Sequence, residues 1–153
     1  MPVLLALHDV EGDETDLPPV LRMIAPGWTV LSPRLSGNAQ ELVQWIEANA
    51  AERPYALGYG TGADLGATLL LQHPGVIAGA ILLRPTEATV QPSAAPIEGR
   101  PVLVVTGGPA ECDQLLRALT EAGASVDFAQ NTERSLTPQD FSMARQWLAQ
   151  FSS

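Results

Sequence analysis

Few side chains in this chain could carry out covalent or acid–base catalysis. Its 153 residues include one cysteine, Cys112, two histidines, His8 and His73, and no lysine. The absence of lysine excludes a Schiff base, a phosphate-loop lysine and a Ser-x-x-Lys catalyst. A single cysteine excludes an intrachain disulfide and a cysteine-based zinc cluster. We therefore expect no bound metal and no cofactor.

One segment has the composition of a ligand-binding turn between an apolar run and a helical one. It is Gly58-Tyr59-Gly60-Thr61-Gly62. Glycine tolerates the positive φ of a tight strand-to-helix turn, and N–H groups at the start of a helix can hold an anion. The segment also fits the Gly-x-Gly-x-x-Gly/Ala pattern of dinucleotide sites. However, it follows the third expected strand instead of the first, and Asp64 adds negative charge, so a small anion or ligand is the favoured occupant.

His8 and Asp9 follow the first expected strand and belong to the same candidate ligand site. His8 could act as a base, but a hydrogen-bonding role in its loop is the favoured interpretation. The carboxylate of Asp9 would oppose the developing oxyanion of an acyl-transfer reaction. The acidic residues between Glu11 and Asp16 resemble part of a calcium loop, but the bidentate glutamate at the end of such a loop is missing. The dipole of the following helix explains these acids without a metal.

The elements that must position these residues follow from alternating apolar and amphipathic runs. Apolar runs predict about six strands, at residues 3–7, 28–31, 55–57, 77–83, 102–105 and 126–128. Helical spacing predicts helices at residues 17–24, 39–50, 63–71, 111–122 and 138–151. Thr137, Pro138 and Asp140 indicate the start of the last helix, and Gly123 the end of the one before it. The alternation predicts an α/β fold with a single doubly wound, mostly parallel sheet, helices on both faces, and one domain over residues 1–153.

Short motifs at the ends of these elements point to a known fold. They are His8 with Gly-Asp-Glu-Thr-Asp-Leu at 12–17, Leu-Ser-Pro-Arg at 31–34, Leu-Gly-Tyr at 57–59, His-Pro-Gly at 73–75, Leu-Leu-Arg-Pro at 82–85 and Leu-Thr-Pro at 136–138. With these motifs the chain resembles the α/β-hydrolase fold over nearly its whole length. More narrowly, it is similar to the small bacterial phospholipase/carboxylesterase family of serine esterases. Against that family the chain is short, with the insertion after the second strand reduced to residues 35–38.

The resemblance also implies where a catalytic triad would lie, and none of the three positions carries the family's residue. The serine of Gly-x-Ser-x-Gly corresponds to Gly60, the acid to Ala110 and the histidine to Arg134. Glycine has no side chain to acylate, and arginine stays charged and cannot shuttle a proton. Thr61 lies one position past the nucleophile, and we interpret it as a helix cap. The fallback catalytic candidates are Thr61, His8, Glu111 and Asp113.

Charge and apolar content limit the partners. Eight arginines against 17 acidic residues give a formal net charge of −9, so the chain has no basic patch for nucleic acid. No apolar run approaches the ~18 residues of a membrane span, and no signal-peptide pattern is present, so we expect a cytoplasmic protein. Apolar residues of the last helix could face a second copy in a homodimer. They are Phe141, Trp147, Leu148 and Phe151.

These observations favour a degenerate esterase/phospholipase-like homologue that is non-catalytic and has a role in binding or association, with an unknown small ligand or protein as partner. The first alternative is a weak or repurposed carboxylic-ester hydrolase that uses Thr61 or His8. The second is a module that binds a small anion or ligand at the Gly58–Gly62 turn.

Overall fold

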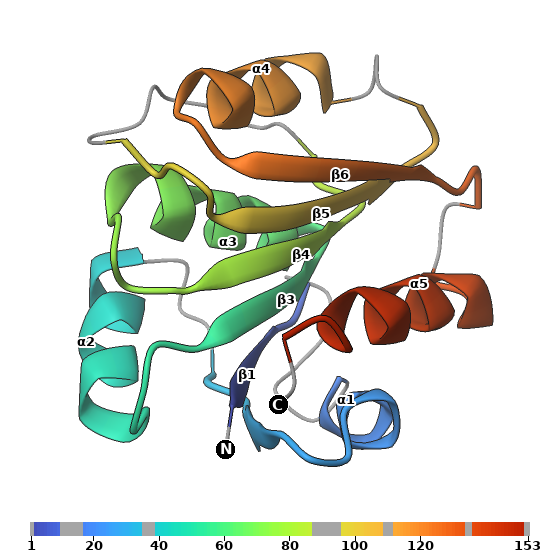
Figure 1. Ribbon diagram of the computed structural model, residues 1–153. Coiled ribbons are helices and arrows are strands. Elements are labelled where there is room, and N and C mark those ends of the chain that lie inside the picture. Colours follow the sequence, from blue (N-terminus) through green and yellow to red (C-terminus); the bar gives the residue numbers. More distant parts are fainter. Residues whose placement is uncertain are drawn as a thin grey trace.

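The computed structural model describes residues 2–9, 17–34, 39–86, 96–108, 112–133 and 136–151. These residues form one sheet of six parallel strands in the order β2-β1-β3-β4-β5-β6 (Figure 1). The strands are β1 (Val3–Leu7), β2 (Thr29–Leu31), β3 (Tyr55–Tyr59), β4 (Gly79–Leu83), β5 (Pro101–Thr106) and β6 (Ser125–Gln130). The order reverses between β1 and β3, and ligands of such sheets bind outside the carboxyl ends of the strands at this point.

Helices cover both faces of the sheet, as expected. The helices are α1 (Pro18–Ile24), α2 (Ala39–Asn49), α3 (Thr61–Gln72), α4 (Asp113–Glu121) and α5 (Pro138–Leu148). One core cluster contains residues of α2, α3 and α4, and the other contains residues of α1 and α5. The predicted fold class is therefore confirmed. No helix in the described part of the chain is long and apolar enough to cross a bilayer.

Burial of both sheet faces explains why the central strands contain almost no polar residues. Successive residues of a strand point to opposite faces. In β1, Leu5 and Leu7 belong to the core under α2, α3 and α4, and Leu4 and Ala6 belong to the core under α1 and α5. All five residues of β1 and all five of β4 are buried. Strand β6 is the last strand on one side of the sheet. It is longer than the predicted range 126–128, because the residues at both of its ends also pair with β5.

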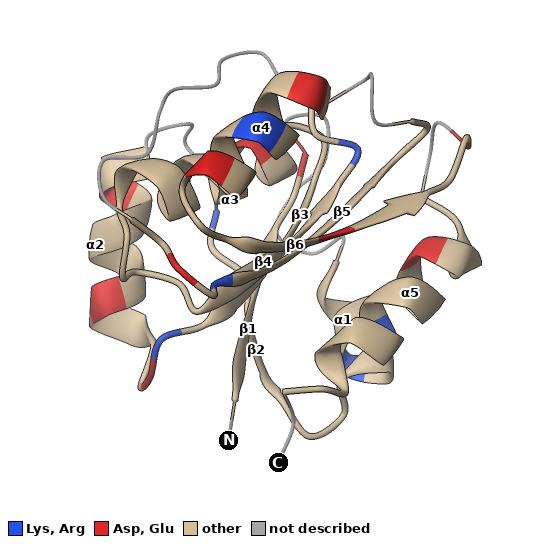
Figure 2. Cartoon of the chain, turned by 45° about the horizontal axis from the view of Figure 1, so that its top comes forward, with Lys and Arg blue, Asp and Glu red and all other residues tan. Residues whose placement is uncertain are grey.

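Local signals set the helix ends. An acidic residue lies in the first turn of each of four helices, where it complements the helix dipole: Glu41, Asp64, Asp113 and Asp140 (Figure 2). The predicted start of α5 is confirmed, because Thr137 is the N-cap residue and its backbone N–H donates to Asp140 Oδ2 at 2.8 Å. Gly123 follows α4 with a φ of 94°, which confirms its role as a helix stop.

An aromatic cluster closes the core where β3 begins. The ring of Tyr55 lies 5.4 Å from that of Trp28 and 5.1 Å from that of Phe151, and the rings of Trp147 and Phe151 are 4.8 Å apart. Trp147 and Leu148 are almost completely buried. These two residues of α5 therefore belong to the core. Of the four apolar residues expected to face a second copy, only Phe141 and Phe151, which are half-buried, could still do so.

The position of Tyr55 in this cluster leads to a pH-dependent effect on stability. Burial raises the pKa of the Tyr55 hydroxyl above its usual value. The folded state thus favours the neutral phenol, and the stability that this provides is lost as the pH rises past the unfolded pKa of about 10. Urea unfolding at about pH 8 and about pH 11 should show a smaller loss of stability in Tyr55→Phe than in the wild type. An equal loss in both proteins would contradict the prediction.

Candidate functional site

The glycine-rich segment forms a sharp elbow between β3 and α3. Gly60 is the N-cap residue of α3, with φ 60° and ψ −121°, and its N–H donates to the carbonyl of Leu83 at 2.9 Å. On either side of it, Gly58 and Gly62 lie so close to neighbouring backbone atoms that neither position has room for a side chain. A Cβ at Gly58 would overlap the carbonyl of Gly62, and a Cβ at Gly62 would overlap the carbonyl of Leu7. The predicted turn is therefore present, and its three glycines are each required by backbone geometry.

The carboxylate of Asp9 lies directly against this elbow. A Cβ built on Gly60 would overlap Asp9 Oδ1 and come within 2.8 Å of Asp9 Cγ. Asp9 Oδ1 also accepts hydrogen bonds from the backbone N–H and from the hydroxyl of Thr61, each at 2.9 Å. The parallel pairing of β1 with β3, which sets Leu7 beside Gly58, brings the two strand ends together. The carboxylate of Asp9 thus accepts the first backbone N–H of α3, at a helix end that favours an anion.

This geometry changes the role predicted for Thr61. Thr61 is the first helical residue after the N-cap residue Gly60, and its own hydroxyl donates to Asp9. The side chain that caps α3 is therefore that of Asp9, which follows β1 and is 52 positions away in the sequence. The prediction that Thr61 caps the helix was wrong. Sequence reasoning recognised the charge of Asp9 but not its position, since no local pattern links residues 52 positions apart.

His8 forms a hydrogen bond within its own loop, the kind of contact that the sequence favours. It is 9% exposed, and its Nδ1 lies 2.8 Å from the backbone carbonyl of Asp9. A carbonyl oxygen only accepts, so Nδ1 carries the proton and donates. The bond fixes the backbone of Asp9 and so helps to hold its carboxylate over the elbow. His73 is the C-cap residue of α3, and its backbone N–H donates to the carbonyl of Leu69.

The end of β5 leads to the candidate acids. Thr106 is buried, and its hydroxyl donates to the carbonyl of Gly108 at 2.7 Å. Ala110 and Glu111 lie outside the described residues. Asp113 is exposed and pairs with Arg117 at 3.2 Å, one turn along α4. Cys112 is completely buried and lies next to the hydroxyl of Thr106, so its thiol is packed in the core.

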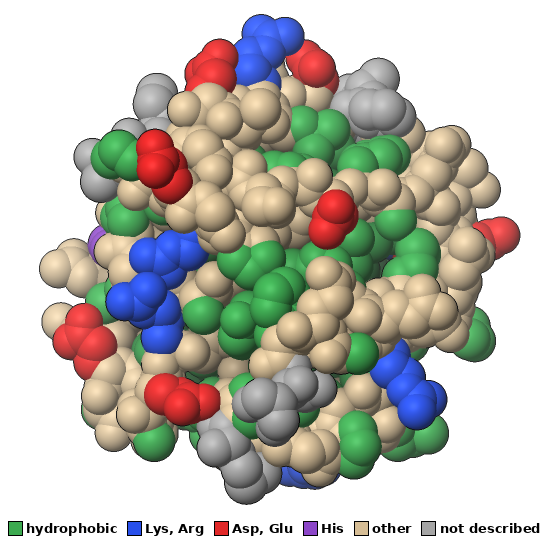
Figure 3. Space-filling model, in the orientation of Figure 1, with side chains coloured by type: hydrophobic (Ala, Val, Ile, Leu, Met, Phe, Trp, Pro, Cys, Tyr) green, Lys and Arg blue, Asp and Glu red, His purple; other side chains and the backbone are tan. Residues whose placement is uncertain are grey.

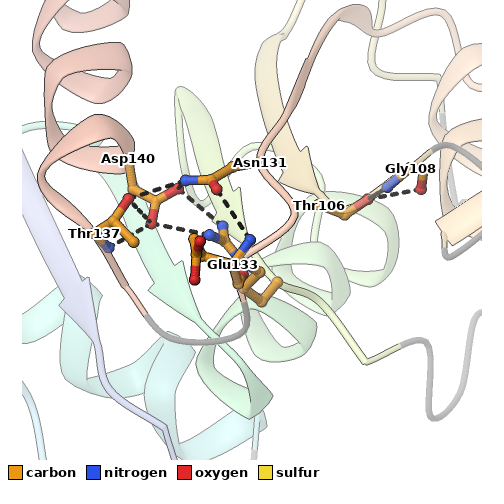
Figure 4. A network of polar contacts seen from close by, with 7 residues as sticks. Thr106, Gly108, Asn131, Glu133, Thr137 and Asp140 are labelled. Carbon is orange, nitrogen blue, oxygen red and sulfur yellow. Dashed lines mark hydrogen bonds and ion pairs between the residues drawn. The ribbon is translucent and has the colours of Figure 1, made fainter.

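A buried polar network, which sequence reasoning missed, also lies at the carboxyl ends of the strands (Figure 4). Arg84, just after β4, forms two bonds to the carboxylate of Asp140, of 2.9 and 3.1 Å, and its Nε donates to the carbonyl of Glu133 at 2.8 Å. Asn131 donates to Asp140 Oδ1 and to the hydroxyl of Thr137, each at 3.0 Å. The Asp140 side chain is completely buried. The network connects β4 and the end of β6 to the start of α5.

Backbone strain accompanies this network. Arg84 has a φ of 53°, the one positive value among the non-glycine residues of the described chain. Such a conformation costs about 1–3 kcal/mol and persists where surrounding contacts determine it. The paired guanidinium of Arg84 supplies such contacts. The capping-box pattern in the sequence marks Asp140 as a helix cap, but it gives no sign of the second partner, which is 56 residues away.

The comparisons with known proteins agree with this architecture. No family model matches the chain. A Bacillus subtilis protein named as a hydrolase, MhqD, is 29% identical over 95% of this chain and 91% of its own length. The carboxylesterase of Bacillus cereus has a similar structure, with a TM-score of 0.86, 25% identity, and coverage of 97% of this chain and 88% of that one. The carboxylesterase of Mesorhizobium loti gives a TM-score of 0.85 at 26% identity and the same coverage. The chain has the α/β-hydrolase fold.

Within the α/β-hydrolase fold, the elbow carries the nucleophile, and the N–H of the following residue helps to hold the oxyanion. The resemblance predicts that in this chain these two positions are Gly60 and Thr61. Arg134, which the resemblance assigns to the histidine position, lies outside the described residues. The alignment with MhqD runs over 183 positions, more than the 153 residues of this chain. That relative therefore contains residues without a counterpart here.

The described residues contain no group of three or more His, Cys, Asp or Glu side chains that could hold a metal ion. The acidic residues 11–16 lie outside the described residues. Of the candidate ligand contacts, the structure brings His8, Asp9, Gly60 and Thr61 together, with Gly58 and Gly62 buried beneath them and Tyr59 half-buried at the end of β3. It does not place Asp113 in this group.

Proposed function

We propose that this chain is a degenerate, esterase-like α/β-hydrolase homologue that acts by binding or association and does not hydrolyse esters. The observation that supports this most strongly is the Asp9 carboxylate, which lies against Gly60 and accepts the N–H of Thr61. In an ester hydrolase of this fold, a nucleophile and an oxyanion would take these two places.

Electrostatics argues against a transition state at this site. An oxyanion formed beside the elbow would stand next to a fixed carboxylate. Two like unit charges about 4 Å apart repel by about 4 kcal/mol at an effective dielectric constant of 20. That free energy corresponds to about a thousandfold in rate. The carboxylate thus opposes catalysis in addition to the loss of the nucleophile's side chain.

Thr61 offers the alternative nucleophile, and its own hydrogen bonds weaken that alternative. A carboxylate that accepts from a hydroxyl can act as a base toward it. However, Asp9 Oδ1 accepts the Thr61 hydroxyl and the Thr61 N–H together. The carboxylate that would activate the Thr61 hydroxyl therefore also occupies the Thr61 N–H. That N–H is the donor that would be needed to hold an oxyanion at the elbow. His8 Nδ1 is bound to the carbonyl of Asp9, which supports a structural role for that histidine as well.

The binding role has a consequence for the kind of ligand. A small anion at the Gly58–Gly62 turn would have to displace the Asp9 carboxylate from Thr61, so the proposal favours a neutral ligand or a protein partner there. A second copy of the chain remains one such partner. We propose a cytoplasmic protein, as expected from the sequence.

The test is hydrolysis of short-chain p-nitrophenyl esters by the purified protein. We expect no rate above that of buffer. Thr61→Ala is the diagnostic variant, and Thr120→Ala is its control, because Thr120 is an exposed threonine on α4 whose hydroxyl donates to the carbonyl of Leu116. A rate that is present in the wild type and in Thr120→Ala but absent in Thr61→Ala would show that Thr61 is a nucleophile and overturn the proposal.

A further inference from the structure

A groove lies between the C-terminal ends of α1 and α5, where β1 and β2 begin. This is the edge of the sheet opposite the elbow. The two helices lie side by side (Figure 1). One wall of the groove is the turn that leads from α1 into β2, and the other is the last turn of α5. Its volume of about 360 Å³ is within the range of small-molecule sites.

The apolar residues of this groove are held in place by the core. Ala25, Trp28 and Leu148 line it, and all three are almost completely buried in the core cluster under α1 and α5. The N–H of Trp28 donates to the carbonyl of Ala25 at 3.0 Å, and the N–H of Thr29 donates to the carbonyl of Pro2 at 2.9 Å. These bonds fix the turn against the start of β1. A pre-formed apolar groove favours an apolar ligand, because little chain entropy is lost when its walls are covered.

Gly27 lies in the same turn and also lines the groove. Its φ is not positive, so the backbone conformation does not require a glycine there. A Cβ built on Gly27 meets nothing within 4 Å, so no neighbouring atom requires one either. The absence of a side chain at this position leaves the groove open to a ligand.

One positive charge lies at this apolar groove. Arg145 is the only charged residue among the described residues that line it. It is exposed in the last turn of α5 and precedes Leu148 by three positions, so the two side chains share one side of the helix. The ion pairs of the described chain do not include Arg145, the one acid of α5, Asp140, is buried, and residues 17–34 contain no acid. Figure 3 shows an arginine among hydrophobic side chains at the lower right of the molecule, over α1 and α5. A positive charge without an acid beside it attracts an anionic group.

We propose that this groove binds a small monocarboxylic acid, with its apolar body against Trp28 and Leu148 and its carboxylate at the guanidinium of Arg145. Burial of the apolar body supplies affinity. A guanidinium binds a carboxylate through two parallel, charge-assisted N–H bonds, and this supplies selectivity for an acid over a neutral molecule of the same shape. The groove and the elbow lie at opposite edges of the sheet, so this inference does not depend on the function proposed above.

The test is an NMR titration of the Trp28 indole N–H signal with sodium octanoate and, in separate samples, with 1-octanol. We expect octanoate to shift the Trp28 signal in a saturable way and to leave the signal of Trp45, which packs against the other core cluster, in place. Octanol should bind about tenfold more weakly, because it lacks the charge-assisted bonds to Arg145. Arg145→Gln should weaken octanoate binding by about the same factor and leave octanol binding unchanged. Arg117→Gln is the matched control, an exposed arginine of α4, and should bind both molecules as the wild type does.

Equal affinity for octanoate and octanol, or shifts that never saturate, would overturn the proposal. A second pair of variants tests the groove itself. Gly27→Leu should weaken the binding of both molecules by filling the groove, whereas Gly108→Leu, at another glycine whose Cβ would meet nothing within 4 Å, should not. Undiminished binding in Gly27→Leu would place the ligand outside the groove and contradict the site. A Trp28 signal that changes with protein concentration before any ligand is added would show that a second copy of the chain covers the groove instead.

Discussion

Replacing Asp140 with alanine is expected to lower the free energy of unfolding by about 3 to 5 kcal/mol, the cost of leaving one partner of a buried ion pair uncompensated. The carboxylate is completely buried and receives two bonds from Arg84 and one from Asn131, besides the N–H of Thr137. In a chain of this length the melting temperature should fall by about 2–4 °C for each kcal/mol. Thermal unfolding followed by circular dichroism measures this change.

Asp113→Ala is the matched control for this variant. Asp113 also pairs with an arginine and also lies in the first turn of a helix, but the side chains of its ion pair are 67% and 64% exposed. An exposed pair contributes at most about 1 kcal/mol. If both variants lose the same small stability, the network around Asp140 does not fix the start of α5 in the way that the geometry indicates.

Gly60→Ser is expected to produce no ester hydrolysis and to destabilise the protein. Serine at a φ of 60° restores backbone strain of about 1–3 kcal/mol. In addition, its Cβ would overlap the Asp9 carboxylate, which must then leave the N–H of Thr61. Gly27→Ser is the control, because a Cβ at Gly27 meets nothing within 4 Å and its φ is not positive. Melting curves and the p-nitrophenyl assay measure both parts of the prediction.

A double-mutant cycle separates strain from the collision with Asp9. In Asp9→Gly the space beside Gly60 is open, so adding Gly60→Ser should cost less than it does in the wild type. Neighbouring residues of this kind show coupling of about 0.5–3 kcal/mol. Additive effects would mean that the carboxylate does not occupy the position of the missing side chain. Measurable turnover in Gly60→Ser alone would contradict the loss of the catalytic residues.

The sheet could be predicted from the sequence because the strands carry their own signal. Residues of β1 and β4 are apolar without interruption, and this pattern is typical of parallel strands that are buried on both faces. The positive φ of Gly60 likewise follows from a glycine at the elbow. Signals of this kind are local, and a single chain displays them.

The contacts that define the site could not be predicted, because they join distant positions. The placement of Asp9 over the elbow depends on the register that pairs Leu7 with Gly58. The bond between Arg84 and Asp140 depends on the crossover that brings α5 back to the end of β4. The capping-box pattern predicted the local partner of Asp140 and left its distant partner unseen. The sequence therefore indicates which residues are present at the edge of the sheet, and tertiary packing decides which of them meet.

The burial of Cys112 makes the protein's single thiol a reporter of its own opening. The cysteine is completely buried between the end of β5 and the first turn of α4. A thiol reagent cannot reach it until this part of the structure separates from the sheet. The rate of labelling then measures how often that local unfolding occurs, without any introduced probe. Because the chain has no second cysteine, the labelling kinetics report on one site alone.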